Sequence, residues 1–455
     1  MSFTSKETIA ALATAPLSAG VAVIRISGPK AFKAAKSLFP SLDKAAPKRM
    51  IYGPVKTLNG DNIDHGLAVY FKAPASFTGE DVVEIHCHGG RAIVQEILDN
   101  LTSVDGVCQA EAGEFSRRAF LNGKMDLVEA EGLADLIAAE TKVQRQQALR
   151  QLEGELGNRF ESWRQQVMHL LAHVEAAIDF PDEELEVLEE AGLKAKLEKL
   201  IYDLETAIQS NIGERVRQGF SVVILGRPNA GKSTLINLLS GQETAIVSPF
   251  AGTTRDVVET HLDIGGFPVV LADTAGLRET EDVIEKEGVR RAAEKAKGAD
   301  LAVVVVDAGE WPALDKAIEP VLKTVPSLIV VSKVDQHADS QVADKENIPV
   351  LACDLTQPAT LDTILPALKD ILQKEYQQAR EGALVTRGRH RACIQNALKH
   401  LKRARELYMQ KSEVSLSDLL AQDLRDVARE IGNVTGRTDS EAVLDVVFST
   451  FCIGK

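Results

Sequence analysis

The chain has 455 residues, a length that predicts about three domains rather than a single core. Its composition, 45% hydrophobic and 26% charged, is typical of a soluble globular protein, and no run of about 20 apolar residues that would span a membrane is present. The formal net charge of −14 argues against a protein that coats nucleic acid non-specifically, so any RNA contact would use a local basic surface.

The five cysteines are widely scattered and odd in number, which indicates free thiols in a reducing compartment. The small apolar stretch 9–20 is preceded by a single basic residue, Lys6, and runs directly into the β-rich segment 21–26. We therefore interpret it as part of the fold rather than as a secretory signal, and we expect a cytoplasmic protein.

The first 118 residues predict a compact α/β domain. Strands are expected at 21–26, 66–71 and 82–88, and helices at 31–38 and 92–101. His86 and His88 would share one face of a strand, which invites a metal site. No spaced ligand partner accompanies them, so we favour a strand end turned by two glycines.

Long amphipathic helices are predicted on both sides of a later α/β module. One apolar stripe runs from Leu149 to Val174 and is expected to end at Pro181, and a second covers 193–208. Two more helices are expected around 398–408 and 420–431, the latter stopped by Gly432. The fold class that follows is an α/β P-loop GTPase domain inserted in an all-helical domain, plus an N-terminal mixed α/β domain. The predicted boundaries are 1–118 (N-terminal), 119–218 and 379–455 (helical), and 219–378 (G domain).

The segment that organises the module is Gly226-Arg227-Pro228-Asn229-Ala230-Gly231-Lys232-Ser233, which follows a strand-like run, 220–225, and precedes a helix. A strand, a glycine-bounded loop and a helix N-terminus form the context of a phosphate-binding loop. Lys232 would reach the β- and γ-phosphates, and the Ser233 hydroxyl would bind Mg²⁺.

Further nucleotide motifs follow in the expected order. Asp273-Thr274-Ala275-Gly276 follows a buried run and is placed to hold Mg²⁺ through water and to sense the γ-phosphate. Thr254 is the candidate second hydroxyl ligand of Mg²⁺. Ser332-Lys333-Val334-Asp335 follows the strand-like run 328–331, and a carboxylate at Asp335 accepts from the two donors of guanine. Ser332 stands where the usual motif has Asn. Together these motifs predict a GTPase.

Leu277 stands where Ras-like enzymes carry the glutamine that orients the attacking water. Another group must therefore place the water, and the acidic segment 279–287 offers candidates. Arg255 and Arg278 are candidate arginine fingers, and the alternative is that their side chains are solvated or paired locally.

The chain resembles a known family, the bacterial tRNA-modification GTPases called MnmE or TrmE, over essentially its whole length. The motifs that carry the resemblance include Arg25-Ile26-Ser27-Gly28, Phe77-Thr78-Gly79-Glu80-Asp81, Gly113-Glu114-Phe115, Lys124-Met125-Asp126-Leu127, the run Phe180-Pro181-Asp182-Glu183-Glu184, and the terminal Phe451-Cys452-Ile453-Gly454-Lys455. The last two are the most specific.

The resemblance implies an N-terminal domain that binds formyl-tetrahydrofolate and mediates formation of a homodimer. It places folate contacts at Arg25, Glu84, Lys124 and Lys455. It also implies that K⁺ replaces the arginine finger, with K⁺ ligands at Asn229, Ser248, Phe250 and Thr253, and that Glu285 positions the water. The complete predicted GTP-binding set is Asn229, Ala230, Gly231, Lys232, Ser233, Thr234, Ser248, Pro249, Phe250, Ala251, Gly252, Thr253, Thr254, Asp273, Thr274, Ala275, Gly276, Lys333 and Asp335.

The function implied by the resemblance is K⁺-activated GTP hydrolysis that drives modification of carbon 5 of the wobble uridine of certain tRNAs. The family acts with a flavin-dependent partner that carries FAD and NADH, and uses a folate-borne one-carbon unit. A basic stretch from Arg387 to Arg405 is a candidate surface for tRNA or the partner, or a solvated helix face. The alternatives are a ribosome-assembly GTPase that acts as a binding switch and, less favoured, a self-assembling dynamin-type GTPase.

Overall fold

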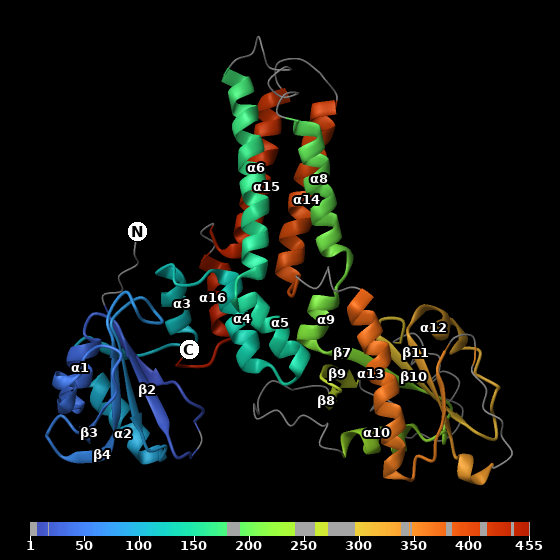
Figure 1. Cartoon of the computed structure of the whole chain (residues 1–455), viewed down its shortest axis with the longest axis horizontal. Helices are drawn as coiled ribbons and strands as arrows, with labels where there is room; N and C mark the ends of the chain where they lie inside the picture. The colour runs from blue at the N-terminus through green and yellow to red at the C-terminus, as the bar shows by residue number, and fades with distance from the viewer. Residues whose placement is uncertain are drawn as a thin grey trace. The chain divides into compact units, whose positions relative to one another are not determined.

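A computed structural model describes residues 7–16, 18–179, 192–241, 260–271, 296–337, 345, 348–378, 385–409, 416–437 and 441–454 (Figure 1). The chain divides into two compact units. The first comprises Met1–Ala134, Gln151–Gln165 and Arg429–Lys455, and the second comprises Asp135–Arg150 and Gln166–Ala428. Each unit is described by itself below.

The N-terminal part of the first unit is built on a six-stranded sheet in the order β3-β4-β5-β2-β1-β6. Its strands are β1 (Thr8–Leu12), β2 (Ala22–Ser27), β3 (Ile51–Lys56), β4 (Asn62–Phe71), β5 (Val82–Cys87) and β6 (Val107–Gln109). All neighbours are antiparallel except β1 and β6. Helices α1 (Ala31–Leu38) and α2 (Arg91–Thr102) pack against it through the core that contains Ile24, Ile26 and Ile85. The sequence thus predicted the mixed α/β domain correctly but missed β1, β3 and β6.

The second unit contains a six-stranded sheet in the order β12-β11-β10-β7-β9-β8. Its strands are β7 (Phe220–Leu225), β8 (Thr260–Ile264), β9 (Phe267–Leu271), β10 (Leu301–Asp307), β11 (Ser327–Ser332) and β12 (Val350–Ala352). All neighbouring pairs are parallel except β8 and β9. The apolar runs at 220–225, 301–306 and 328–331 are therefore confirmed as buried strands of a parallel sheet, which needs cover on both faces.

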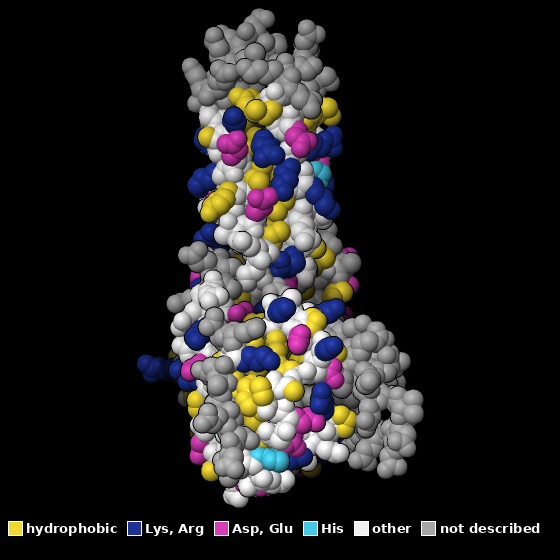
Figure 2. Space-filling model, turned by 90° about the vertical axis from the view of Figure 1, so that its right-hand side faces the viewer, with side chains coloured by type: hydrophobic (Ala, Val, Ile, Leu, Met, Phe, Trp, Pro, Cys, Tyr) yellow, Lys and Arg dark blue, Asp and Glu magenta, His cyan; other side chains and the backbone are white. Residues whose placement is uncertain are grey.

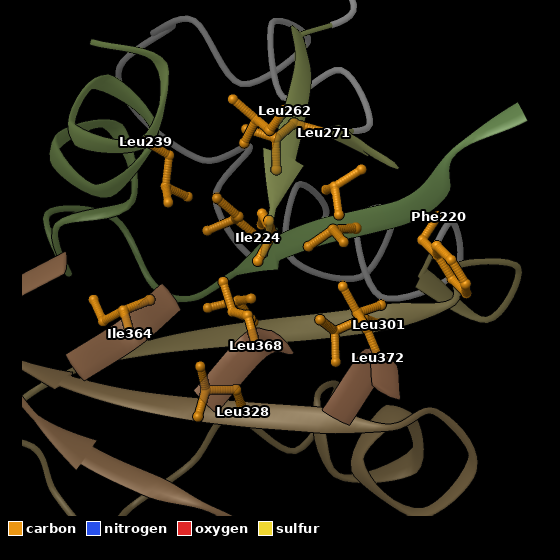
Figure 3. Packing of buried hydrophobic residues seen from close by; sticks show 14 of the residues in the cluster. Phe220, Ile224, Leu239, Leu262, Leu271, Leu301, Leu328, Ile364, Leu368 and Leu372 are labelled. Carbon is orange, nitrogen blue, oxygen red and sulfur yellow. The ribbon is translucent and has the colours of Figure 1, made fainter. Parts of the chain in front are cut away.

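The two faces of this sheet are covered by different helices because successive side chains of a strand point to opposite sides. On one face, Ile224, Leu301 and Leu328 pack against α10 (Lys232–Ser240) and α13 (Leu361–Gln378), as Figure 3 shows. On the other face, Val304 and Val331 pack against the short helix α12 (Glu319–Thr324). Because β7, β10 and β11 are parallel, their carboxyl ends lie at the same end of the sheet, where the loops that follow them meet.

Helices make up the remainder: α3 (Glu114–Leu121), α4 (Leu127–Ala138), α5 (Lys142–Leu152), α6 (Glu155–Asp179), α8 (Leu193–Gln209), α9 (Ile212–Gln218), α14 (Gly388–Met409), α15 (Leu416–Thr435) and α16 (Glu441–Ser449), with single 3-10 turns at Pro40–Lys44, Val334–Gln336 and Pro358–Thr360. In the second unit α8 packs on α14. The buried leucines of α8 (Leu193, Leu197, Leu200 and Leu204) follow the predicted stripe. The described helices thus flank the α/β module in the chain, as the predicted insertion requires.

Two helix boundaries differ from the prediction. The stripe from Leu149 to Val174 is not one helix, because Gly154 has a left-handed backbone (φ 83°) and separates α5 from α6. Gly432 does not end α15. The helix continues to Thr435, where Gly436 is left-handed (φ 76°) and the N–H of Arg437 donates to the Gly432 carbonyl at 3.0 Å. That six-residue bond is the Schellman form of helix end.

Candidate functional site

The phosphate-binding loop has the backbone that its sequence predicts. Gly226 (φ 150°) directly follows β7, and Gly231 (φ 99°) directly precedes α10. Both have positive φ, and so does Asn229 between them (φ 58°). A Cβ at Gly226 would collide with the carbonyl oxygen of Val305 on β10, so only glycine fits. The loop ends at the N-terminus of α10, where backbone N–H groups and the helix dipole favour an anion.

Lys232 is folded back onto the loop it follows. Its Nζ donates to the carbonyls of Gly226 at 2.9 Å and Arg227 at 2.6 Å, and burial lowers its pKa. Ser233 and Thr234 are exposed at the start of α10, so the Ser233 hydroxyl is free to bind a cation beside a phosphate. A hard oxygen donor at this position fits Mg²⁺.

The predicted guanine loop lies beside the phosphate loop. Ser332, the buried last residue of β11, donates from Oγ to the Ala230 carbonyl at 2.7 Å and lies 3.2 Å from the Val306 carbonyl. Lys333 is left-handed (φ 56°), and its Nζ contacts Asp307 Oδ2 at 2.7 Å. Asp335 is exposed in the turn that follows. The structure therefore brings the phosphate loop and the guanine motif together at the carboxyl edge of a parallel sheet.

Several predicted residues lie outside the described part of the chain: Ser248, Pro249, Phe250, Ala251, Gly252, Thr253, Thr254, Asp273, Thr274, Ala275, Gly276, Glu285 and Lys455. The K⁺ ligands other than Asn229, the second Mg²⁺ hydroxyl and the water-positioning carboxylate are among them. Their roles stay predictions.

Two of the predicted folate residues meet on neighbouring strands. Arg25 on β2 is opposite Glu84 on β5, and its Nε and Nη2 each lie 2.9 Å from Glu84 Oε1. The Arg25 guanidinium also lies over the rings of Phe77 and Phe115, at 5.3 and 5.8 Å from their centroids. The Nζ of Lys124 donates to the carbonyl oxygen of Pro74 at 3.1 Å.

A buried polar network next to this site was missed in the sequence. Arg118 on α3 is almost fully buried and pairs with Glu80 at 3.1 Å and Glu114 at 2.7 Å. Glu80 also accepts from the Ser27 hydroxyl at 2.7 Å. An arginine in an eight-residue helix offers no pattern that reveals this, because its partners come from distant segments. The network joins the end of β2 to α3, the helix that carries Phe115.

In the structure, His86 and His88 contact different carboxylates. His88 contacts Asp64 at 2.8 Å, and His86 on β5 lies 3.6 Å from Glu84. Among the described residues, the one group of three metal-binding side chains is His400, Asp423 and Asp426. Arg403 lies 3.3 Å from Asp423 there and already supplies a positive charge.

In the basic stretch from Arg387 to Arg405, most of which lies on α14, several cations are paired within the chain. Arg391 pairs with Glu214 at 3.2 Å, Lys402 with Glu205 at 2.6 Å, and Arg387 with Asp135 at 2.7 Å. On the face of the molecule that Figure 2 shows, Lys and Arg side chains are interspersed with acidic and hydrophobic side chains. This pattern favours helix-to-helix pairing over a continuous cationic surface.

None of the described helices is both long enough and apolar enough to cross a membrane.

The chain is similar to known proteins over almost its whole length. A family model described as "MnmE helical domain" matches residues 127–452, and one described as "GTP-binding protein TrmE N-terminus" matches residues 8–124. The chain is 47% identical to a tRNA modification GTPase MnmE of Parvibaculum lavamentivorans, covering 99% of this chain and 100% of that protein. It is 45% identical to the MnmE of Rhodospirillum rubrum, covering 99% of each. It is 41% identical to the mitochondrial 5-taurinomethyluridine tRNA synthase subunit GTPB3 of Danio rerio, covering 99% of this chain and 93% of that protein.

Proposed function

The chain belongs to the MnmE (TrmE) family of tRNA modification GTPases, and we propose that it hydrolyses GTP to drive modification of carbon 5 of the wobble uridine of certain tRNAs. The chain is a GTP hydrolase that takes part in tRNA modification. The proposal adds the position on the tRNA, the activating cation, the folate and the partner.

The observation that carries the nucleotide assignment is the contact between the two loops. The hydrogen bond from Ser332 Oγ to the Ala230 carbonyl, 2.7 Å long, joins the strand that leads to Asp335 to the loop that leads to Lys232. A guanine base bound at Asp335 and a polyphosphate bound at Lys232 therefore belong to one ligand. Ser332 makes this contact although it replaces the usual Asn, which supports guanine binding in this chain.

The residues of the chain have separate tasks in hydrolysis. The backbone N–H groups at the start of α10 and the ammonium of Lys232 bind and neutralise the phosphates, while Ser233 supplies an oxygen for Mg²⁺. We assign Asn229, in its exposed left-handed position, to K⁺, together with Ser248, Phe250 and Thr253. Glu285 is assigned to orientation of the attacking water, since Leu277 has no hydrogen-bonding side chain. Asp273 and Thr254 complete the Mg²⁺ site.

The one-carbon unit is proposed to come from formyl-tetrahydrofolate bound at Arg25, Glu84, Lys124 and Lys455. Arg25 is held by Glu84 and rests on two aromatic rings, so its guanidinium is preorganised for an anionic or planar group. We propose a cytoplasmic homodimer that acts on tRNA with a flavin-dependent partner, which binds FAD and NADH.

Mass spectrometry of tRNA nucleosides from cells that lack the protein tests the function. The carbon-5 modification of the wobble uridine should disappear and return with the wild-type gene. Unchanged wobble uridines would contradict the proposal and favour a ribosome-assembly GTPase. GTP turnover should also be faster in K⁺ than in Na⁺ at equal ionic strength, and equal rates would remove K⁺ from the mechanism.

A further inference from the structure

The carboxylate of Asp307 lies between the two loops assigned to the nucleotide. Asp307 ends β10 and is opposite Ser332 in the parallel register with β11. Its Oδ2 lies 2.7 Å from Lys333 Nζ, and its Oδ1 accepts from the N–H of Gly309 at 3.0 Å. The loop that begins here continues to Glu310, which pairs with Arg227 of the phosphate loop at 3.2 Å.

The same carboxylate faces both ends of the turn that carries Asp335. Lys333 precedes that turn, and His337 follows it with Nε2 at 3.7 Å from Asp307 Oδ1. The turn is short: Asp335 and Gln336 are exposed, while Val334 is partly buried against the hydrophobic cluster that contains Val304 and Val331. Lys333 also has a left-handed backbone, a conformation that a lysine keeps only where its surroundings impose it. The ion pair with Asp307 is such a constraint.

We propose that Asp307 is the positioning residue of the guanine subsite, acting through Lys333. This inference rests on the proposed binding of guanine nucleotide. With its ammonium held at Asp307, the methylene stem of Lys333 is stretched along the loop and presents a fixed apolar edge against which a flat purine packs. The same contact fixes the turn, so that Asp335 meets the edge of the base without first being ordered by it. Asp307 itself does not touch the base.

The ion pair makes Asp307 suited to this task. Its pKa is lowered, chiefly by the hydrogen bond from Lys333, so the carboxylate is ionised at neutral pH. Asp307 and Lys333 are both partly exposed, with 23% and 34% of their side-chain surface accessible. Bound nucleotide is therefore able to reach the pair from the solvent side.

A double-mutant cycle in the full-length protein tests the proposal. Binding of GDP and of ADP, each with Mg²⁺, is measured by calorimetry for wild type, Asp307→Asn, Lys333→Met and the double variant. Asp307→Asn should weaken GDP binding by about tenfold, which corresponds to about 1.4 kcal/mol. If Asp307 acts through Lys333, the double variant binds GDP no more weakly than Lys333→Met alone. Asp307→Glu, which keeps the charge, should recover part of the affinity.

Asp370→Asn is the matched control, since Asp370 is an exposed aspartate on α13 of the same module. It should bind GDP as the wild type does. The proposal would be overturned if the losses of GDP affinity in the two single variants multiply in the double variant, or if Asp307→Asn binds GDP as the wild type does. If Asp307→Asn does not fold, Asp307→Glu is used in the same cycle. A wild-type protein that does not prefer GDP to ADP would instead refute the proposed function itself.

Discussion

Arg387 donates from Nη2 to Oδ1 of Asp135 at 2.7 Å, although 252 positions separate them in the chain. The same oxygen accepts from Arg217 Nε at 3.0 Å. Arg217 lies just before β7, where the chain enters the α/β module, and Arg387 lies just after the module, before α14. One carboxylate at the end of α4 therefore holds both connections between the module and the helices.

Replacement of Asp135 by alanine should loosen both connections. Two arginines lose a charged partner, and the free energy of local opening of α9 and of the first turn of α14 should fall by about 2 kcal/mol. Native-state hydrogen exchange measures this, with faster exchange at 212–218 and 388–391 and no change in β10. Glu205→Ala, which removes the half-exposed partner of Lys402, should change protection by less than about 0.5 kcal/mol. Equal exchange in the Asp135 variant and the wild type would show that the ion pairs of Asp135 with Arg217 and Arg387 do not stabilise these two connections.

Gly226→Ala should strongly weaken nucleotide binding. The new Cβ would meet the Val305 carbonyl, and φ of 150° is unfavourable for alanine, so the loop must move. We expect GDP affinity to fall by at least about 100-fold, a loss of about 2.7 kcal/mol. Gly388→Ala is the control, because nothing lies within 4 Å of a Cβ there and alanine favours a helix. Retained GDP binding in Gly226→Ala would contradict the close approach of β7 and β10.

Lys232→Met should separate nucleotide affinity from stability. Burial lowers the folded-state pKa of Lys232 from its usual 10.5, so the folded chain binds this proton more weakly than the unfolded chain does. The lysine therefore destabilises the nucleotide-free fold at neutral pH, and the penalty fades as pH rises from the folded pKa towards 10.5. The variant should be at least as stable as wild type at pH 7, with the difference shrinking above pH 10, while GDP binds about 100-fold more weakly.

Urea unfolding at several pH values and calorimetry with GDP measure the two effects. Lys323→Met, on the exposed side of α12, is the control and should bind GDP normally. A Lys232→Met protein that is less stable than wild type at pH 7 would show that the two carbonyl contacts of the ammonium outweigh its desolvation.

The cysteines should differ widely in reactivity. Burial raises the pKa of Cys87 and of Cys353 to about 11, which leaves about one thiolate in a thousand at pH 8. Cys452 is exposed. In native protein, iodoacetamide should label Cys452 first, as read by peptide mass spectrometry, and all five cysteines should react in urea. Early labelling of Cys353 would mean that the β11–β12 edge opens readily.

Arg25→Ala should weaken folate binding. The substitution takes away a guanidinium that is held by Glu84 and two rings, and leaves that carboxylate without its cation. Equilibrium dialysis with formyl-tetrahydrofolate should show a loss of at least about tenfold, or 1.4 kcal/mol. Lys36→Ala removes an exposed ion pair with Asp43 in the same domain and should bind as wild type. Unchanged binding by Arg25→Ala would move the folate site elsewhere.

Much of the fold follows from local pattern. The runs at 301–306 and 328–331 are apolar throughout and the run at 220–225 is apolar except for Ser221, and strands buried on both faces need such a composition. The helix at 31–38 has the residues and boundaries predicted for it. The sequence pattern does not predict the short strands β1 and β6, because alanine-rich or three-residue segments carry little periodicity.

The phosphate loop, the guanine motif and the membership of the family were determined by the sequence alone, since each depends on residue types at fixed short spacing. Only the tertiary structure decided which residues support them. The partners Ser332 and Ala230 are 102 positions apart, and Asp135 and Arg387 are 252 apart. The alignment of strands in the sheet and the packing of helices create these contacts. The spacing of residues along the chain does not reveal either arrangement.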